Sequence, residues 1–170
     1  MRGYDPAAWD SFFTAMIAAA AGLTGLLFVA VSINLDRIIN GSKFLPARAA
    51  ETLATLLLVL ISSALALIPQ STQLIGLEIE IVVVPVLIAT VSNQLGYRRE
   101  NPQDPLLWTL SRMGGTALAT VPCTVAALSL AVHWGGGFYW LAPTSLLGIV
   151  GSVYNAWVLL VEIVRLSRSS

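Results

Sequence analysis

The sequence predicts an all-α protein, a polytopic bundle of five transmembrane helices with its N-terminus outside and its C-terminus in the cytoplasm. Three observations predict this fold: few residues are charged, long runs contain no charged residue, and the basic residues fall on one side of the predicted membrane. Of 170 residues, 56% are hydrophobic and only 11% are charged, whereas an ordinary soluble domain has about a quarter of its residues charged. Because so few charges could not cover a soluble surface, we expect residues 1–170 to form a single transmembrane domain with no soluble domain.

Charged residues divide the chain into apolar runs of the length that a membrane requires. The uncharged runs hold 25, 26, 17 and 49 residues and cover residues 11–35, 52–77, 81–97 and 113–161. A helix needs about 20 apolar residues to cross about 30 Å of hydrocarbon. The last run fits two helices and divides at the three glycines of residues 135–137, which end a helix readily. We therefore expect spans at about residues 9–35, 47–68, 73–97, 106–132 and 138–165.

Helix-start signals agree with these spans. Asp5-Pro6 and Asp104-Pro105 each place an N-cap acceptor before a proline at the first helical position, and Ser71 or Thr72 can cap the third helix. Basic residues then set the orientation. With five spans, eight of the nine fall on one side: Arg37, Lys43, Arg48, Arg98, Arg99, Arg112, Arg165 and Arg168. The positive-inside rule makes that side cytoplasmic.

Composition also excludes several classes of function. A net charge of zero argues against nucleic-acid binding, since nothing could neutralise a run of phosphates. One cysteine and one histidine exclude the usual zinc sites, and the sequence has no phosphate loop and no nucleophile–base set. We therefore expect no enzyme activity, no metal and no cofactor.

Two acidic residues and three threonines form the candidate pore, or outer acidic zone. Glu78 and Glu80 lie about one turn inside the outer end of the third helix and face nearly opposite ways. In an oligomer one of them could ring a pore mouth and favour cations, whereas the alternative places both among lipid headgroups. On the fourth helix Thr116, Thr120 and Thr124 form one stripe, which could line a pore or bond its own backbone. The adjacent proline of residue 122 predicts a kink.

Four amides form a candidate inner polar cluster in the cytoplasmic half: Asn34, Asn93, Gln94 and Asn155. An unsatisfied amide in hydrocarbon costs several kcal/mol, so each requires a partner. The preferred interpretation is hydrogen bonding between helices, worth about 1 kcal/mol per contact. The alternative is a polar cavity that binds a solute or water.

Five charged residues form a candidate cytoplasmic-face network: Arg37, Arg48, Glu51, Glu162 and Arg165. The spacing of three residues within the second and fifth helices allows ion pairs along one face. The preferred role is structural, a clamp on helix ends, and the alternative is a gate or a docking surface.

Small residues predict where helices approach closely. Ala18, Gly22 and Gly25 line the first helix, and Gly148 and Gly151 lie on the fifth. Small residues four apart mark packing interfaces in membranes. The first helix is therefore expected either at the centre of the bundle or at a subunit contact.

Four segments resemble a known family: residues 22–35 (GLTGLLFVAVSINL), 45–53 (LPARAAETL), 68–70 (IPQ) and 156–163 (AWVLLVEI). They are similar to small, largely uncharacterised bacterial integral membrane proteins, some labelled modulator of a membrane-bound ATP-dependent protease. The similarity covers most of the chain and implies a multi-pass protein of the bacterial cytoplasmic (inner) membrane. It implies no catalytic residue and points to five polar positions: Asn34, Arg48, Glu51, Gln70 and Glu162.

Two functions remain open from the sequence. The preferred hypothesis is a homo-oligomeric pore or ion channel, because symmetric assembly multiplies the few polar residues of one chain. The alternative is a non-catalytic accessory or regulatory subunit that binds another membrane protein, for example a membrane protease. Both hypotheses expect the lipid bilayer as a partner.

Overall fold

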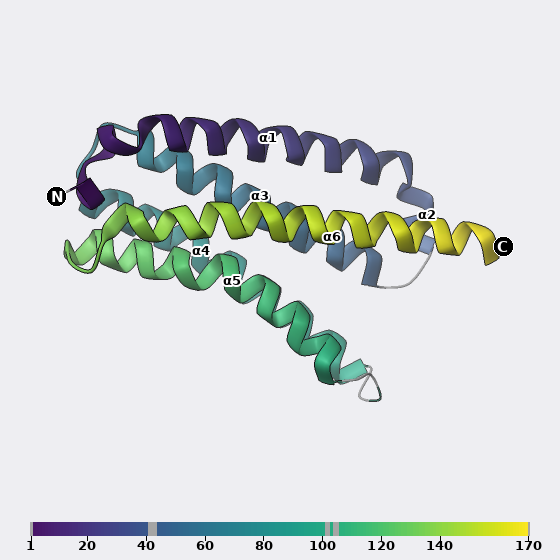
Figure 1. Ribbon diagram of the computed structural model, residues 1–170. Coiled ribbons are helices and arrows are strands. Elements are labelled where there is room, and N and C mark those ends of the chain that lie inside the picture. Colours follow the sequence, from purple (N-terminus) through teal and green to yellow (C-terminus); the bar gives the residue numbers. More distant parts are fainter. Residues whose placement is uncertain (1, 41–43, 101–102, 104–105, 170) are drawn as a thin grey trace.

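The computed structural model describes residues 2–40, 44–100, 103 and 106–169, and this part of the chain is helical without a strand (Figure 1). The all-α prediction is therefore confirmed for these residues. The helices in chain order are η1 (Arg2–Tyr4), η2 (Pro6–Trp9), α1 (Asp10–Ile33), α2 (Leu35–Asn40), α3 (Phe44–Leu67), α4 (Thr72–Glu100), α5 (Leu106–Val132), η3 (Gly137–Trp140) and α6 (Leu141–Ser169).

The five long helices run alternately up and down, so the bundle has two ends (Figure 1). The N-terminal end holds η1, η2, η3 and the α3–α4 turn, and the C-terminal end holds α2 and the last turns of α4 and α6. Helix α3 contacts α1, α4 and α6, while α5 packs against α4 and α6. Helix α1 lies at the edge, since its main neighbour is α3.

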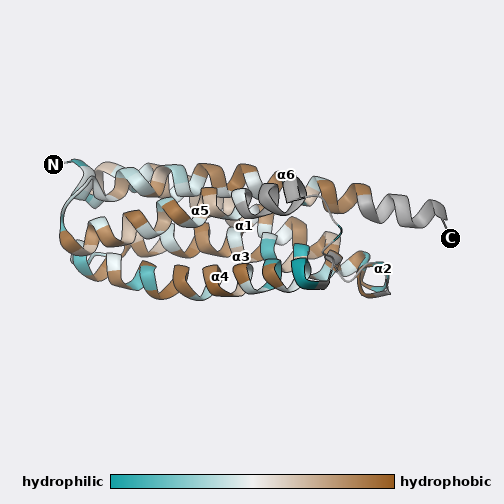
Figure 2. Ribbon diagram, turned by 90° about the horizontal axis from the view of Figure 1, so that it is seen from below, coloured by the Kyte–Doolittle hydropathy of each residue, from teal (hydrophilic) through white to brown (hydrophobic). Residues whose placement is uncertain are grey.

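Four stretches are long and apolar enough to cross a membrane: Pro6–Ile33, Leu45–Leu67, Thr72–Arg99 and Gly137–Val161. Figure 2 shows hydrophobic residues along most of the length of these helices. Such stretches indicate a membrane protein. Helix α5 is 27 residues long, but its described apolar part, Thr116–Val132, is shorter than the other four. A fifth crossing and the direction of insertion remain predictions.

Helix bounds lie within a few residues of the predicted spans. The clearest difference is at Asn34, where φ −109° and ψ 18° end α1 and a short helix, α2, follows. The pattern of charged and apolar residues does not predict α2. The expected caps form at two sites: Ser71 Oγ accepts from the backbone N–H of Leu74, and Asp5 accepts from that of Ala7. Asp5 caps η2 rather than α1, and residues 104 and 105 lie outside the described residues.

The apolar core divides into two clusters along the bundle. The cluster toward the N-terminal end includes Phe13, Ile79, Leu130 and Phe138, and the rings of Phe13 and Phe138 have centroids 5.6 Å apart. The second cluster, toward the C-terminal end, joins α1, α2, α3 and α6 through Leu27, Ile38, Leu45, Ala49, Leu56 and Leu159. Aromatic contacts therefore hold η2, α1 and η3 together at one end, and aliphatic contacts hold α2 at the other.

Two glycines allow helices to pack with their backbones in close approach. A Cβ atom at Gly76 of α4 would lie 2.5 Å from the Ala127 carbonyl oxygen of α5, and one at Gly148 of α6 would lie 2.6 Å from Val59 Cγ2 of α3. A real side chain does not tolerate contacts this short, so α4 is closely packed on α5 and α6 on α3. The glycine at 148 thus lies at a packing contact, as the sequence predicts.

The small residues of α1 behave differently. Ala18, Gly22 and Gly25 are exposed, and a Cβ atom at either glycine would meet no atom within 4 Å. A Cβ atom at the half-buried Gly151 of α6 would likewise meet no atom within 4 Å. Only 11% of the α1 span is buried, against 39% for α3. Of the two positions expected for the first helix, the structure therefore does not support the central one.

Candidate functional site

The threonine stripe of α5 contacts α4 through Thr116. Gln94 Nε2 of α4 donates a hydrogen bond of 2.8 Å to Thr116 Oγ1. One and two turns further along, the hydroxyls of Thr120 and Thr124 donate to the carbonyl oxygens four residues back, at 2.9 and 3.1 Å. Two of the three hydroxyls therefore satisfy backbone groups of their own helix, and the third joins two helices.

The two acidic residues of α4 lie in different surroundings. Glu78 accepts a hydrogen bond from Gln70 Nε2 in the α3–α4 turn. Glu80, two residues further along α4, is half-buried. Its Oε2 atom is enclosed by protein and has no hydrogen-bond partner in the described part of the chain. Since Glu80 lies eight residues into α4, it is about 12 Å from the start of that helix.

The four predicted amides do not share one site. Asn34 donates to the Ala30 carbonyl oxygen of its own helix at 2.9 Å, whereas Gln94 is buried and bonded to α5. Its neighbour Asn93 is exposed. Asn155 of α6 accepts from Arg48 Nη2 of α3 at 3.5 Å. Hydrogen bonds between helices, the preferred interpretation, are thus present at two of the four amides.

The predicted charge network is only partly described. Arg48 is half-buried and Glu51, one turn further along α3, is 8% exposed. Both therefore lie within the bundle rather than on its surface. Arg37 of α2 is exposed, and the side chains of Glu162 and Arg165 lie outside the described residues. The link to Asn155, from the amide set, was not anticipated.

A buried row of small hydroxyls along α3 and α6 also escaped the sequence analysis. Its members are Thr52, Ser62 and Ser63 on α3 and Thr144, Ser145 and Ser152 on α6, each at most 3% exposed. They lie on either side of the close Gly148–Val59 contact. The sequence signal for this row is the spacing of three and four residues on α6, at positions 145, 148, 152 and 155, which places these small and polar residues on one face of the helix. Small residues let α3 and α6 approach closely.

A group of side-chain hydrogen bonds holds the N-terminal end of the bundle together. Ser129 Oγ of α5 accepts from the Gly137 N–H at 2.8 Å, and Tyr4 Oη accepts from the Gly136 N–H at 3.0 Å. The positive φ values of these glycines, 57° and 118°, permit the turn. The His133 ring lies on Tyr4, with centroids 4.3 Å apart. These contacts fasten η1 to the α5–η3 turn, a structural role.

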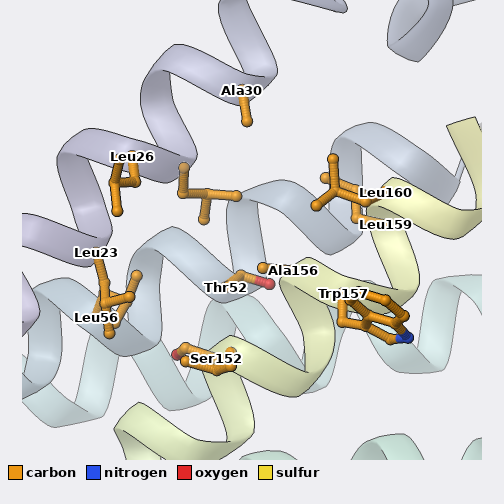
Figure 3. A pocket seen from close by; sticks show the side chains of 12 residues that line it. Leu23, Leu26, Ala30, Thr52, Leu56, Ser152, Ala156, Trp157, Leu159 and Leu160 are labelled. Atoms are coloured by element: carbon orange, nitrogen blue, oxygen red, sulfur yellow. The ribbon is translucent and has the colours of Figure 1, made fainter.

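An apolar groove lies between α1, α3 and α6, with a cavity of about 270 Å³ (Figure 3). Leucine and alanine side chains such as Leu23, Leu27 and Ala156 form its walls, and Trp157 lies beside it. Thr52 and Ser152 contribute the few polar atoms. The Thr52 hydroxyl is bonded to the Arg48 carbonyl oxygen. The groove therefore suits a hydrocarbon chain better than a polar substrate.

The contacts of these side chains are helix packing contacts and separate polar contacts. Among the described residues, no three or more His, Cys, Asp or Glu side chains gather where they could hold a metal ion. Comparison with family models, with curated proteins and with solved structures found no match to this chain.

The adjacent amides of α4 provide a matched test of the bond between α4 and α5. Replacing the buried Gln94 with Leu removes its hydrogen bond to Thr116, whereas Asn93→Leu changes an exposed side chain on the same turn. We expect Gln94→Leu to lower the free energy of unfolding by about 1 kcal/mol. Asn93→Leu should leave it nearly unchanged. Reversible denaturation in mixed micelles measures both, and equal effects would contradict this assignment.

Proposed function

We propose that this chain is a non-catalytic accessory protein of the membrane, which binds another membrane protein through the open face of α1. The observation that carries the proposal is that, among the described residues, no atom lies within 4 Å of a Cβ placed at Gly22 or Gly25. Inside the bundle, by contrast, Gly76 and Gly148 are each covered by a neighbouring helix.

The cost of exposed glycines supports this proposal. A glycine in a helix interior is less stable than alanine by about 1 kcal/mol. At Gly76 and Gly148 close helix packing offsets that cost. At Gly22 and Gly25 no neighbour in the described part of the chain offsets it. Since membrane helices associate by close packing rather than by the hydrophobic effect, a partner helix lying on this face would supply the missing contacts.

The other exposed surfaces favour an accessory protein over a pore formed on an axis between copies of this chain. The large exposed side chains of α4, α5 and α6 are mostly aliphatic: Leu77, Ile81, Ile88, Leu118, Val121, Leu128, Leu146 and Val150. An axial pore between chains needs a polar wall on an exposed face. The resemblance to a family that includes labelled protease modulators agrees with an accessory role, for example on a membrane protease of the bacterial inner membrane.

The proposed topology has five crossings, with the N-terminal end outside and the C-terminal end in the cytoplasm. The alternation of α1, α3, α4, α5 and α6 and the one-sided basic residues support it. Gln103 and Trp134 are exposed residues before and after α5, so labelling them tests the fifth crossing.

In a Cys123→Ala background, we expect Trp134→Cys to react with a membrane-impermeant maleimide in intact cells. Gln103→Cys should react only after the membrane is permeabilised. The two sites would label alike if α5 did not cross, and the opposite pattern would reverse the orientation.

A bulky residue on the α1 face tests the accessory role. We expect Gly22→Leu to weaken partner binding by about 1 to 2 kcal/mol, roughly five- to thirty-fold in affinity, because the added side chain holds the helices apart. Co-purification from native membranes in mild detergent measures the loss. The matched control is Ala89→Leu, which adds similar bulk at an exposed position of α4.

The control defines the outcomes of that experiment. Recovery of the partner should fall with Gly22→Leu and persist with Ala89→Leu. Equal losses would mean that the α1 face is not the contact. Recovery of a self-assembled species alone would count against the accessory role and favour the pore.

A homo-oligomeric pore or ion channel is the second candidate, and Glu80 is the observation in its favour. Its partly enclosed carboxylate lies about 12 Å along α4, and one buried oxygen has no hydrogen-bond partner among the described residues. Ionisable groups within membrane spans usually mark ion or proton pathways. We expect cation flux into liposomes that carry the protein, and a loss of that flux in Glu80→Gln. Glu78→Gln is the control on the opposite flank, and absence of flux in the unchanged protein rejects the pore.

A further inference from the structure

One proline lies in each helix of the α4–α5 hairpin, Pro85 in α4 and Pro122 in α5. Gly76 of α4 lies against residues 127–131 of α5, and Gln94 of α4 bonds Thr116 of α5. Pro85 lies midway between Gly76 and Gln94, and Pro122 lies near the middle of the matching stretch of α5. Because the two helices are antiparallel neighbours, both prolines therefore occupy the same level of the bundle.

Each proline weakens its helix at that level. Proline has no backbone N–H, so the carbonyl oxygens of Ile81 and Leu118 lose the donor that a regular helix supplies four residues later. Sharp bends in helices occur mainly at prolines. Two such defects at one level give the hairpin a common hinge line.

The segments on the two sides of the hinge are held differently. Toward the N-terminal end, α4 is locked to α5 at Gly76, and the Ser129–Gly137 hydrogen bond anchors α5 to η3. Toward the C-terminal end, the Gln94–Thr116 hydrogen bond links α4 to α5. Figure 1 shows α5 turning away from α6 over this second half, while α1, α3 and α6 stay together.

We propose that this second half of the hairpin, residues 86–100 of α4 and 106–121 of α5, is an arm that swings as one unit about Pro85 and Pro122. Its movement relative to α3 and α6 changes access to the C-terminal end of the bundle. That end contains the buried Glu51 and the Arg48–Asn155 hydrogen bond. The proposal is independent of the α1 contact, because α1 lies against α3 rather than against the hairpin.

Because the arm is long, a small change of the kink angle displaces its tip by several ångströms. Leu95 lies ten residues beyond Pro85, about 15 Å along the helix. A 20° change of kink angle therefore displaces Leu95 by about 5 Å. Spin-label distance measurements resolve a shift of this size.

The experiment measures distances between spin labels by pulsed electron paramagnetic resonance in nanodiscs. In a Cys123→Ala background, one pair joins the arm to α6 through Leu95→Cys and Trp157→Cys. The control pair, Leu74→Cys and Leu146→Cys, joins α4 to α6 on the other side of the hinge. All four labelled positions are exposed. We expect a broad or two-component distribution for the arm pair and a narrow one for the control pair.

Replacing the two prolines tests whether they cause the motion of the arm. Pro85→Ala with Pro122→Ala should narrow the arm-pair distribution and shift its mean by about 5 Å, because alanine restores the missing N–H at both sites. The control pair should not change. Each single variant should narrow the arm pair partly, which keeps the test valid if the double variant fails to fold.

An arm-pair distribution as narrow as the control pair in the unchanged protein would overturn the proposal. So would an arm-pair distribution that both proline variants leave unaltered.

Discussion

This structure depends on one constraint: its polar side chains must find hydrogen-bond partners within the protein, without water. Hydrocarbon offers no hydrogen-bond partner, so a polar side chain within a span must find one in the protein. Thr120 and Thr124 use their own backbone, whereas Gln94 uses the next helix and Asn155 uses Arg48 of α3. In the described part of the chain, an enclosed oxygen of Glu80 has no such partner, and neither do the hydroxyls of Ser63, Ser145 and Ser152. Of these four groups only Glu80 is a carboxylate, which is why it stands out as a candidate for conduction.

Small residues then decide which helices approach one another. Gly76 and Gly148 permit contacts that a Cβ atom would prevent, and they join α4 to α5 and α6 to α3. Gly22 and Gly25 belong to the same residue type but lie on an open face at the edge of the bundle. The difference between covered and uncovered glycines is the physical basis of the proposed partner contact on α1.

The two proposals concern different parts of one bundle. The α1 face lies at the edge formed with α3, and the α4–α5 arm lies on the other side of α3. Helix α3 therefore contacts both the proposed binding element and the proposed moving element. Its buried Glu51 and half-buried Arg48 lie at the end of the bundle where the arm diverges.

The sequence by itself determined the helical class and the approximate bounds of the long helices, because apolar length and charged boundaries are one-dimensional properties. It also identified the carboxylates of α4 and several amides of the spans, but not the buried hydroxyls of α3 and α6. Only the tertiary structure decided that Gln94 is buried and Asn93 exposed, and that Arg48 meets Asn155. Periodicity shows which residues share a face of a helix, but the neighbour that covers this face depends on how all the helices pack. For the same reason the glycines of α1 looked like those of the interior until their surroundings were known.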